Sequence, residues 1–438
     1  MIPKAPVEST LRAMGRALLH RNYRLFFFGQ GVSLIGTWLT RVATSWLVYR
    51  LTDSALILGL VGFAGQIPTF VLAPFGGVLV DRWNRHRILV VTQVLAMVQS
   101  ALLAFFALTH TITVAHVLAL SVFQGVINAF DTPARQAFVV DMVEDRADLP
   151  NAIALNSSMV NAARLLGPSV AGVLIAAVGE GTCFLIDAVS YGAVIASLLM
   201  MRLPPVARAP ARSRILAELH EGFRYAASFA PIRAILLLLA LVSLTGVPYT
   251  VLMPVFAARV IGGGPHILGI LMGASGVGAV AGALLLASRR SVLGLGRTMV
   301  IAGALFGAGL IAFSFSRWLP LSMVIMVVVG GGMMVQMAAS NTLLQTLVDE
   351  DKRGRVMSFY TMAFFGMAPF GSLAAGWLGA HVGAPMTVRL GGVVTLVGVA
   401  VFLHKLPALR RAVRPTYVRL GILPEIAAGI SQTTNKQG

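Results

Sequence analysis

Long apolar stretches recur along the whole sequence, separated by short polar segments. Each stretch has about the 20 apolar residues that a helix needs to cross a bilayer. Because lipid offers the backbone no hydrogen-bond partners, stretches of this kind fold as helices. Charged residues make up only 11% of the chain, against about 25% in soluble domains. The sequence therefore predicts an all-α integral membrane protein with twelve transmembrane helices, at residues 25–49, 55–80, 88–108, 112–134, 153–178, 182–201, 233–257, 266–288, 298–316, 320–345, 357–380 and 384–404.

The net charge of +18 follows the predicted spans. Lys and Arg gather in the terminal segments and in every second loop, as they do in the cytoplasmic loops of membrane proteins. Nucleic acid is therefore not needed to explain the basic charge. The pattern predicts a multi-pass protein of the cell inner membrane with both termini in the cytoplasm. The exceptions to the pattern are Arg41, Arg50, Arg164, Arg259, Arg317 and Arg389.

The longest polar segment divides the chain into two halves of six spans each. Residues 1–24 are predicted to form a basic cytoplasmic segment, and residues 405–438 a cytoplasmic tail. Residues 25–201 and 233–404 would form two six-helix bundles. Between the bundles, residues 202–232 combine a Pro-rich basic start with apolar residues at nearly helical spacing. This spacing predicts an amphipathic helix on the inner membrane surface, which tethers the halves or, alternatively, binds a partner.

A polar break at residues 76–87 joins the second and third spans, and it contains Gly77, Asp81, Arg82, Arg85 and Arg87. This spacing, at this place in the chain, resembles the loop 2–3 signature of the major facilitator superfamily. The resemblance covers residues 20–405 and implies the fold of that superfamily, two six-helix bundles that transport by alternating access. An ordinary basic membrane loop is the alternative interpretation.

The resemblance also implies a gate. Asp81 would face the start of the eleventh span near residues 355–358, where a helix N-terminus favours negative charge. Arg85 would reach an acidic residue on the fourth span, either Asp131 or Asp141. The alternative is that these charges only orient the loop during insertion.

In the fifth span, Gly167, Pro168, Ala171 and Gly172 resemble the Gly-Pro-x-x-Gly-Gly core of the antiporter motif, which is typical of exporters in this superfamily. Proline removes a helix hydrogen bond, and small neighbours allow close packing. The motif therefore predicts a kinked span that seals against the opposite half. Alanine replaces glycine at three positions of the longer motif, so tight packing of a kinked helix is the alternative.

Three further stretches, residues 36–48, 130–136 and 345–358, resemble one exporter branch of the superfamily. That branch contains the enterobactin exporter, macrolide-efflux-like proteins and transmembrane secretion effectors.

Charged side chains at membrane depth are rare and usually functional. Arg41 and Asp187 lie at similar depths in the first and sixth spans, which allows a structural ion pair. Arg164, near the middle of the fifth span, has no evident acidic partner. We expect it to face the central cavity and attract an anionic or polyphenolic substrate, although a backbone contact or Asn161 would also satisfy it. The predicted substrate pathway combines the two arginines with polar residues at mid-depth and with Phe365 of the eleventh span. Its members are Thr37, Arg41, Gln66, Gln124, Asn161, Arg164, Tyr249, Gln336 and Phe365.

The sequence contains no ATP-binding loop, so we do not expect ATP to drive transport within this chain. Proton antiport suits the antiporter-like span, and Asp131 and Asp187 are the candidate coupling carboxylates. We expect no metal or other cofactor, because Cys183 is alone and the histidines lack metal-ligand spacing.

The predicted function is export of a small organic molecule, such as a siderophore, a macrolide or another drug-like compound. The partners would be the lipid bilayer, the substrate and protons, and the protein would act as a monomer. Uptake or lysophospholipid transport by the same fold is the alternative. A polytopic membrane enzyme is a remote one, because the histidines are scattered and no large soluble loop is present.

Overall fold

The computed structural model describes residues 15–203, 224–289, 291–350 and 352–422. In these ranges the chain consists of helices joined by short turns, without any strand. Most of the predicted amphipathic helix at 202–232 lies outside the described residues.

Five long helices form the first half. The last of them is too long for one crossing of a bilayer, which takes about 20 residues. It breaks at Gly179, where φ is 78°, a conformation that glycine adopts without steric cost. The helices are α2 (Arg21–Thr52), α3 (Ala55–Arg82), α4 (Arg85–Leu108), α5 (Val114–Met142) and α6 (Leu149–Leu199).

The second half has the same number of spans, two of which are interrupted. The seventh span contains two π-helical turns, η3 and η4, and the eleventh is broken between α13 and α14. The elements are α8 (Ala230–Leu241), η3 (Val242–Gly246), α9 (Tyr249–Val255), η4 (Phe256–Val260), α10 (Pro265–Ala287), α11 (Leu295–Phe315), α12 (Leu319–Leu347), α13 (Arg353–Phe365), α14 (Ala368–Val382) and α15 (Ala384–Arg419).

The predicted all-α fold with twelve spans is confirmed. Ten helices within the described residues are long and apolar enough to cross a membrane. One of these covers both spans of α6, and α2 corresponds to the remaining predicted span at residues 25–49.

Two spans extend further than the hydropathy of the sequence indicates. α5 was expected to end at residue 134 and continues to Met142, because Phe138 and Met142 keep one face buried while polar residues occupy the other. α15 was expected to end at residue 404 and continues to Arg419 for the same reason, with Leu406, Leu409 and Val413 buried between basic residues. Hydropathy misses such amphipathic ends.

Side-chain caps fix the starts of two helices. The Asn84 side chain accepts hydrogen bonds from the backbone N–H of His86 (3.0 Å) and Arg87 (3.3 Å), and so begins α4 within the basic break between the second and third spans. Thr113 and His116 form a reciprocal capping box at the start of α5.

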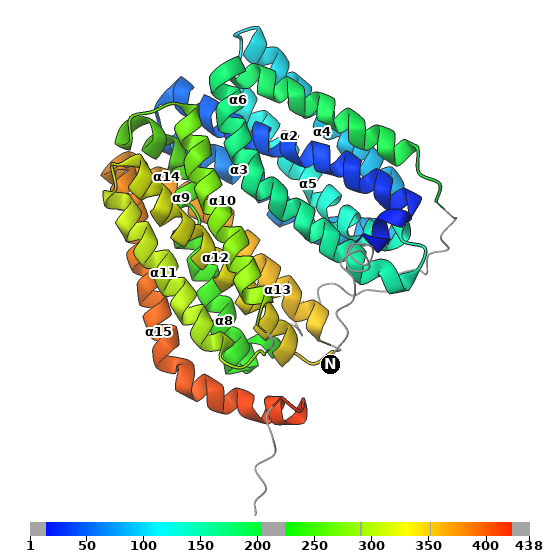
Figure 1. Cartoon of the computed structure of the whole chain (residues 1–438). Coiled ribbons are helices and arrows are strands. Elements are labelled where there is room, and N and C mark those ends of the chain that lie inside the picture. Colours follow the sequence, from blue (N-terminus) through cyan, green and yellow to red (C-terminus); the bar gives the residue numbers. More distant parts are fainter. Residues whose placement is uncertain (1–14, 204–223, 290, 351, 423–438) are drawn as a thin grey trace, which may run out of the picture.

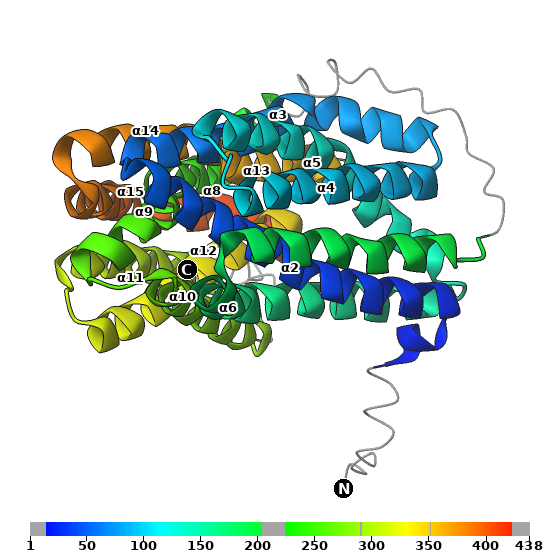
Figure 2. The same cartoon turned by 90° about the horizontal axis from the view of Figure 1, so that it is seen from above.

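The two halves form separate bundles that meet at one end and diverge toward the other (Figure 1). Since an even number of spans lies between them, the described chain ends at residues 15 and 422 share a face with the turns at 83–84 and 348–350. We call this the terminal face. The opposite face carries the turns at 53–54 and 261–264. Seen along a second direction, α6 lies beside α10 and α3 beside α14 (Figure 2).

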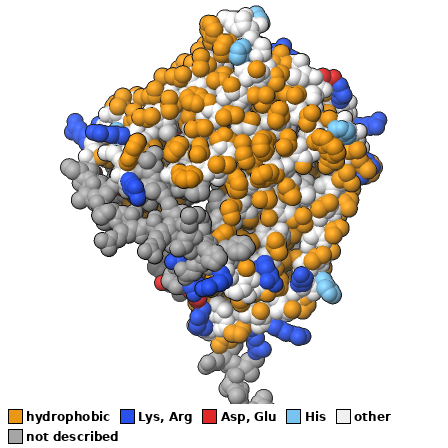
Figure 3. All heavy atoms as spheres, turned by 180° about the vertical axis from the view of Figure 1, so that it is seen from behind, with side chains coloured by type: hydrophobic (Ala, Val, Ile, Leu, Met, Phe, Trp, Pro, Cys, Tyr) orange, Lys and Arg blue, Asp and Glu red, His pale blue; other side chains and the backbone are white. Residues whose placement is uncertain are grey.

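The outer surface of the bundles is hydrophobic. Figure 3 shows apolar side chains over most of the visible face, with Lys and Arg at its margins and toward one end. This distribution is the one expected of a protein that is surrounded by lipid acyl chains.

Candidate functional site

Two helix crossings join the bundles near the opposite face. A Cβ atom on Gly172 of α6 would lie 2.7 Å from the Cα of Gly269 of α10, and one on Gly376 of α14 would lie 2.6 Å from the Cα of Gly59 of α3. Small residues are what allow helix backbones to approach so closely in membranes. α9 makes further contacts with α2 and α3, whereas α8, α12 and α13 make no extensive contact with the first half within the described residues. The halves are therefore sealed toward the opposite face and separate toward the terminal face.

The antiporter-like residues of α6 lie between this seal and the first bundle. A Cβ atom on Gly167 would lie 2.6 Å from the Cγ of Trp38 of α2, and the Pro168 carbonyl faces Gly269 on the other side. Ala171 is fully buried. The motif thus packs against α2 of its own half and α10 of the other half.

Two arginines lie close to this motif. The guanidinium carbon of Arg41 is 4.8 Å from the centre of the Trp38 ring, a cation–π contact. The Arg41 side chain is exposed, although its position along α2 is near the middle of the span. Arg164 is the charged group close enough to repel Arg41, and it also lies near the Tyr249 phenol of α9. Neither arginine forms an ion pair within the described residues.

The ion pair that we considered between Arg41 and Asp187 does not form. Asp187 is 1% exposed and accepts hydrogen bonds from Thr40 Oγ1 (2.6 Å) and Ser100 Oγ (2.7 Å). Because Thr40 and Arg41 are consecutive, their side chains leave α2 about 100° apart, and only Thr40 points to Asp187. No cation pairs with Asp187 in the described part of the chain, so the carboxyl group is buried among hydroxyl donors alone.

Asp131, the other coupling candidate, belongs to a buried network on α4 and α5. It accepts hydrogen bonds from Thr92 Oγ1 (2.9 Å) and Gln93 Nε2 (2.7 Å), and it forms an ion pair with Arg135 one turn further along α5. The pairing of Asp131 with Arg85 that we considered is therefore wrong, because Arg135 already occupies that carboxylate.

Arg85 instead forms an ion pair with Asp141 near the terminal end of α5, at 3.2 Å, and donates to the Ala137 carbonyl (3.3 Å). This contact connects the polar break between the second and third spans to the fourth span. Arg82 and Arg87, which belong to the same break, are exposed. The side chain of Asp81 and the surroundings of Gly77 lie outside what the structure describes, so the gate contact expected of Asp81 stays a prediction.

Most other predicted pathway residues lie at the boundary between the halves or on the first bundle. The Tyr249 hydroxyl is 3.0 Å from the Ser275 hydroxyl of α10, and Gln66 Nε2 donates to Ser372 Oγ (3.4 Å) across the α3–α14 crossing. The other members are Thr37, which donates to the Ser33 carbonyl, Gln124, which donates to Asn128, Asn161, which is half-buried, and Phe365, which is exposed at the end of α13.

Gln336 is an exception. Its side chain is 1% exposed and lies beside Gly303 of α11, inside the second bundle. Neither polar atom of its amide has a partner among the described residues. The prediction that Gln336 lines the pathway is not met in this structure, since depth along α12 does not determine which side of the helix carries the residue.

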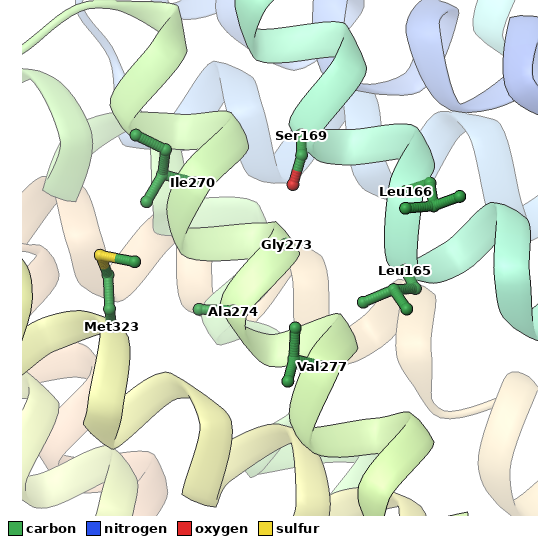
Figure 4. Close-up of a pocket in the computed structure, with 8 residues that line it drawn as sticks. All are labelled: Leu165, Leu166, Ser169, Ile270, Gly273, Ala274, Val277 and Met323. Atoms are coloured by element: carbon green, nitrogen blue, oxygen red, sulfur yellow. The ribbon is translucent and has the colours of Figure 1, made fainter.

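A cavity of ≈ 420 Å³ lies beside the α6–α10 crossing. Leu165 and Leu166 of α6, Val277 of α10 and Met323 of α12 line it, and Ser169 is its polar side chain (Figure 4). Its lining is apolar and includes neither Arg41 nor Arg164, so it is separate from the charged site.

Two of the ion pairs that were not predicted from the sequence bear on the site, Asp131–Arg135 and Asp53–Arg259. Arg135 was not considered because the fourth span was expected to end one residue earlier. Asp53, in the turn between α2 and α3, pairs with Arg259 of η4 and so joins the halves at the opposite face. The Tyr49 phenol, which is close without meeting hydrogen-bond geometry, and the Arg259 guanidinium hold the pKa of Asp53 below its usual value. The sequence offers one indication of this pair, because Arg259 lies alone and outside the basic loops.

Comparison with known proteins identifies a family and a fold. The sequence matches the transmembrane secretion effector family over residues 16–418. It is 27% identical to the staphyloferrin A transporter of Staphylococcus aureus (strain NCTC 8325 / PS 47), over 86% of this chain and 95% of that protein. It is 29% identical to the multidrug efflux pump Tap of Mycolicibacterium fortuitum, over 89% and 98%. A crystal structure of a bacterial homologue of the human lysosomal transporter Spinster, inward-facing and unoccupied, superposes with a TM-score of 0.67 at 15% identity, over 91% of this chain and 98% of that one.

Proposed function

Since the chain belongs to the transmembrane secretion effector family of major facilitator transporters and is not an enzyme, we propose that it exports a small organic molecule across the cell inner membrane. Relatives named as a transporter of staphyloferrin A and as a multidrug efflux pump support export of a siderophore or drug-like compound. The antiporter-like packing of α6 against α10 agrees with this direction.

The observation that carries the proposal is the one-sided seal. Contacts between the halves lie toward the opposite face, while α8, α12 and α13 stand apart from the first half among the described residues. The basic loops support a cytoplasmic terminal face with both termini on that side, from which a substrate would load. Export then requires the bundles at 25–201 and 233–404 to rock, opening the two glycine crossings and closing the terminal face.

Proton antiport would supply the energy. A buried carboxyl group without a cation can exist as a neutral acid in the membrane interior, where an unpaired charge is costly. Asp187 has such surroundings, with hydroxyl donors from α2 and α4. Asp131 is less suited, because Arg135 compensates its charge. We therefore assign proton coupling to Asp187 and expect the protein to act as a monomer.

Inverted membrane vesicles test the proposal. An imposed pH gradient, acidic inside, should drive accumulation of at least one compound from a panel of ethidium, erythromycin and carboxyfluorescein, and a protonophore should abolish it. Asp187→Asn should lose gradient-driven accumulation while keeping downhill exchange. Glu144→Gln, which changes an exposed carboxylate, is the matched control. Accumulation that ignores the gradient would contradict proton antiport, and equal activity of Asp187→Asn and Glu144→Gln would contradict the assignment of Asp187.

A further inference from the structure

Two arginines flank one helix contact in the middle of the membrane. Arg41 lies three residues after Trp38 on α2 and Arg164 three residues before Gly167 on α6, and a Cβ atom on Gly167 would lie 2.6 Å from the Cγ of Trp38. Like charges repel strongly where the dielectric constant is low, and each arginine is costly at this depth even alone. Such an arrangement calls for a negative charge nearby.

The described residues do not provide that charge. Asp187 lies on another side of α2 and is bonded to Thr40 and Ser100, and Asp131 is paired with Arg135. No other carboxylate pairs with either arginine in the described ranges of the chain. The counter-ion must therefore come from outside these ranges, and the solvent-accessible position of Arg41 gives a ligand a way to reach it.

Trp38 lies between the two arginines along the direction of the helix axes. Its side chain packs on Gly167 of α6, while Arg41 lies over its ring at 4.8 Å. Arg41 is one turn above this contact and Arg164 one turn below, so the two Cα atoms differ by roughly 9 Å in height at 1.5 Å per residue. Arginine side chains are long enough to reach across that separation, so a single bound anion can contact both guanidinium groups.

We propose that Arg41 and Arg164 form the substrate-binding site of the transporter and that the substrate is an organic anion carrying carboxylate groups. Guanidinium groups bind carboxylates through two parallel hydrogen bonds, and the Trp38 ring offers an adjoining apolar surface. This inference rests on the proposed function and names the class of compound that would be transported.

The site lies where the second half can respond to binding. Tyr249 of α9 is near Arg164, and its hydroxyl contacts Ser275 of α10, the helix that crosses α6 at Gly269. A carboxylate between the arginines removes their repulsion at the level where the two halves meet. Cationic compounds would add a third positive charge, so the site selects against them.

Binding to the purified protein tests the inference separately from transport. Carboxyfluorescein and rhodamine 6G share a xanthene ring system and carry opposite charges, and fluorescence anisotropy reports the binding of each. We expect carboxyfluorescein to bind, to be displaced by citrate and not by its triethyl ester, and to weaken with ionic strength. Arg41→Gln and Arg164→Gln should each weaken binding about tenfold or more, and Arg164→Lys should weaken it less.

Arg389→Gln is the matched control, since Arg389 also lies over an aromatic ring, 3.8 Å from Phe315, on the second bundle. Its binding should be unchanged. Preferred binding of rhodamine 6G, displacement by the ester as well as by citrate, or undiminished binding in the Arg41→Gln/Arg164→Gln double variant would each overturn the inference. The ester and salt measurements use the wild-type protein, so they decide the matter even if a variant does not fold. A failure of proton-driven accumulation alone would contradict only the proposed function.

Discussion

Gly172→Ala should open the seal at the opposite face. The added Cβ atom would lie 2.7 Å from both the Cα of Gly269 and the carbonyl oxygen of Pro265. Both are backbone atoms, so no side chain can rotate to make room. Overpacking of this kind costs about 1–3 kcal/mol, which corresponds to a shift of about 5- to 150-fold between two conformations. Because the strain exists only while α6 and α10 are crossed, the state in which they separate should gain population.

Gly192→Ala is the matched control, since it lies on the same helix with no atom within 4 Å of its added Cβ. Both substitutions raise helix propensity by about 1 kcal/mol, so the comparison isolates the clash. Spin labels at Thr111 and Arg317, exposed in turns of the two halves at the opposite face, report their separation by double electron–electron resonance. Cys183 is the single cysteine and is buried, so a Cys183→Ala background suffices.

We expect Gly172→Ala to add a longer distance to the distribution and Gly192→Ala to leave it as in the wild type. Identical distributions in the two variants would refute the idea that this crossing holds the seal. A longer distance in both would show that helix propensity, and not the close approach of α6 to α10, controls the equilibrium.

Three other predictions concern the ion pairs. Asp131→Asn should lower the unfolding free energy by about 1–3 kcal/mol because it leaves the half-buried Arg135 without its partner. The Asp131→Asn/Arg135→Gln double variant should recover most of this loss in thermal unfolding in detergent. Arg85→Asp and Asp141→Arg should each destabilise the protein, and their combination should show a coupling of about 0.5–3 kcal/mol in a double-mutant cycle; strict additivity would contradict the pair. Since the pKa of Asp53 is lowered, its pairing with Arg259 is present above the usual aspartate pKa and lost only as the pH falls through the lowered value. In an Asp187→Asn background, where the proposed coupling carboxyl group cannot titrate, the spin-label distances should therefore not change between about pH 5 and 8, and a further Asp53→Asn substitution should lengthen them at pH 7.

The spans were predictable because their cause is local. Apolar composition over about 20 residues is sufficient to fix a crossing. The amphipathic ends of α5 and α15 were missed, as were the interruptions of the seventh and eleventh spans. Arg85 was also expected to reach an acidic residue on the fourth span. The structure contains such a contact, between Arg85 and Asp141. The motif limited the partners of Arg85 to Asp131 and Asp141. Asp141 lies beyond residue 134, where the fourth span was expected to end.

The side-chain partners inside the bundles were not predictable in the same way. A residue number gives depth, since each residue advances 1.5 Å along the helix. Which neighbour it faces depends on how the helix is rotated, and packing against several other helices decides that. Arg41 and Asp187 agree in depth and face different neighbours, and Gln336 has a suitable depth but points into the second bundle.

The imperfect antiporter motif shows how geometry explains what a pattern leaves open. Alanine stands in place of glycine at Ala154, Ala163 and Ala171, which weakened the match. The structure accommodates a Cβ atom at all three, whether exposed at Ala154 or buried at the other two. Glycine is kept at Gly167 and Gly172, where a Cβ atom would meet the Trp38 side chain and the Gly269 backbone. The substitutions therefore fall where a methyl group fits, and the positions that join α6 to α2 and α10 retain the residue that close approach requires. The motif is incomplete as a pattern, yet it is intact at the contacts on which the seal and the position of Trp38 between the two arginines depend.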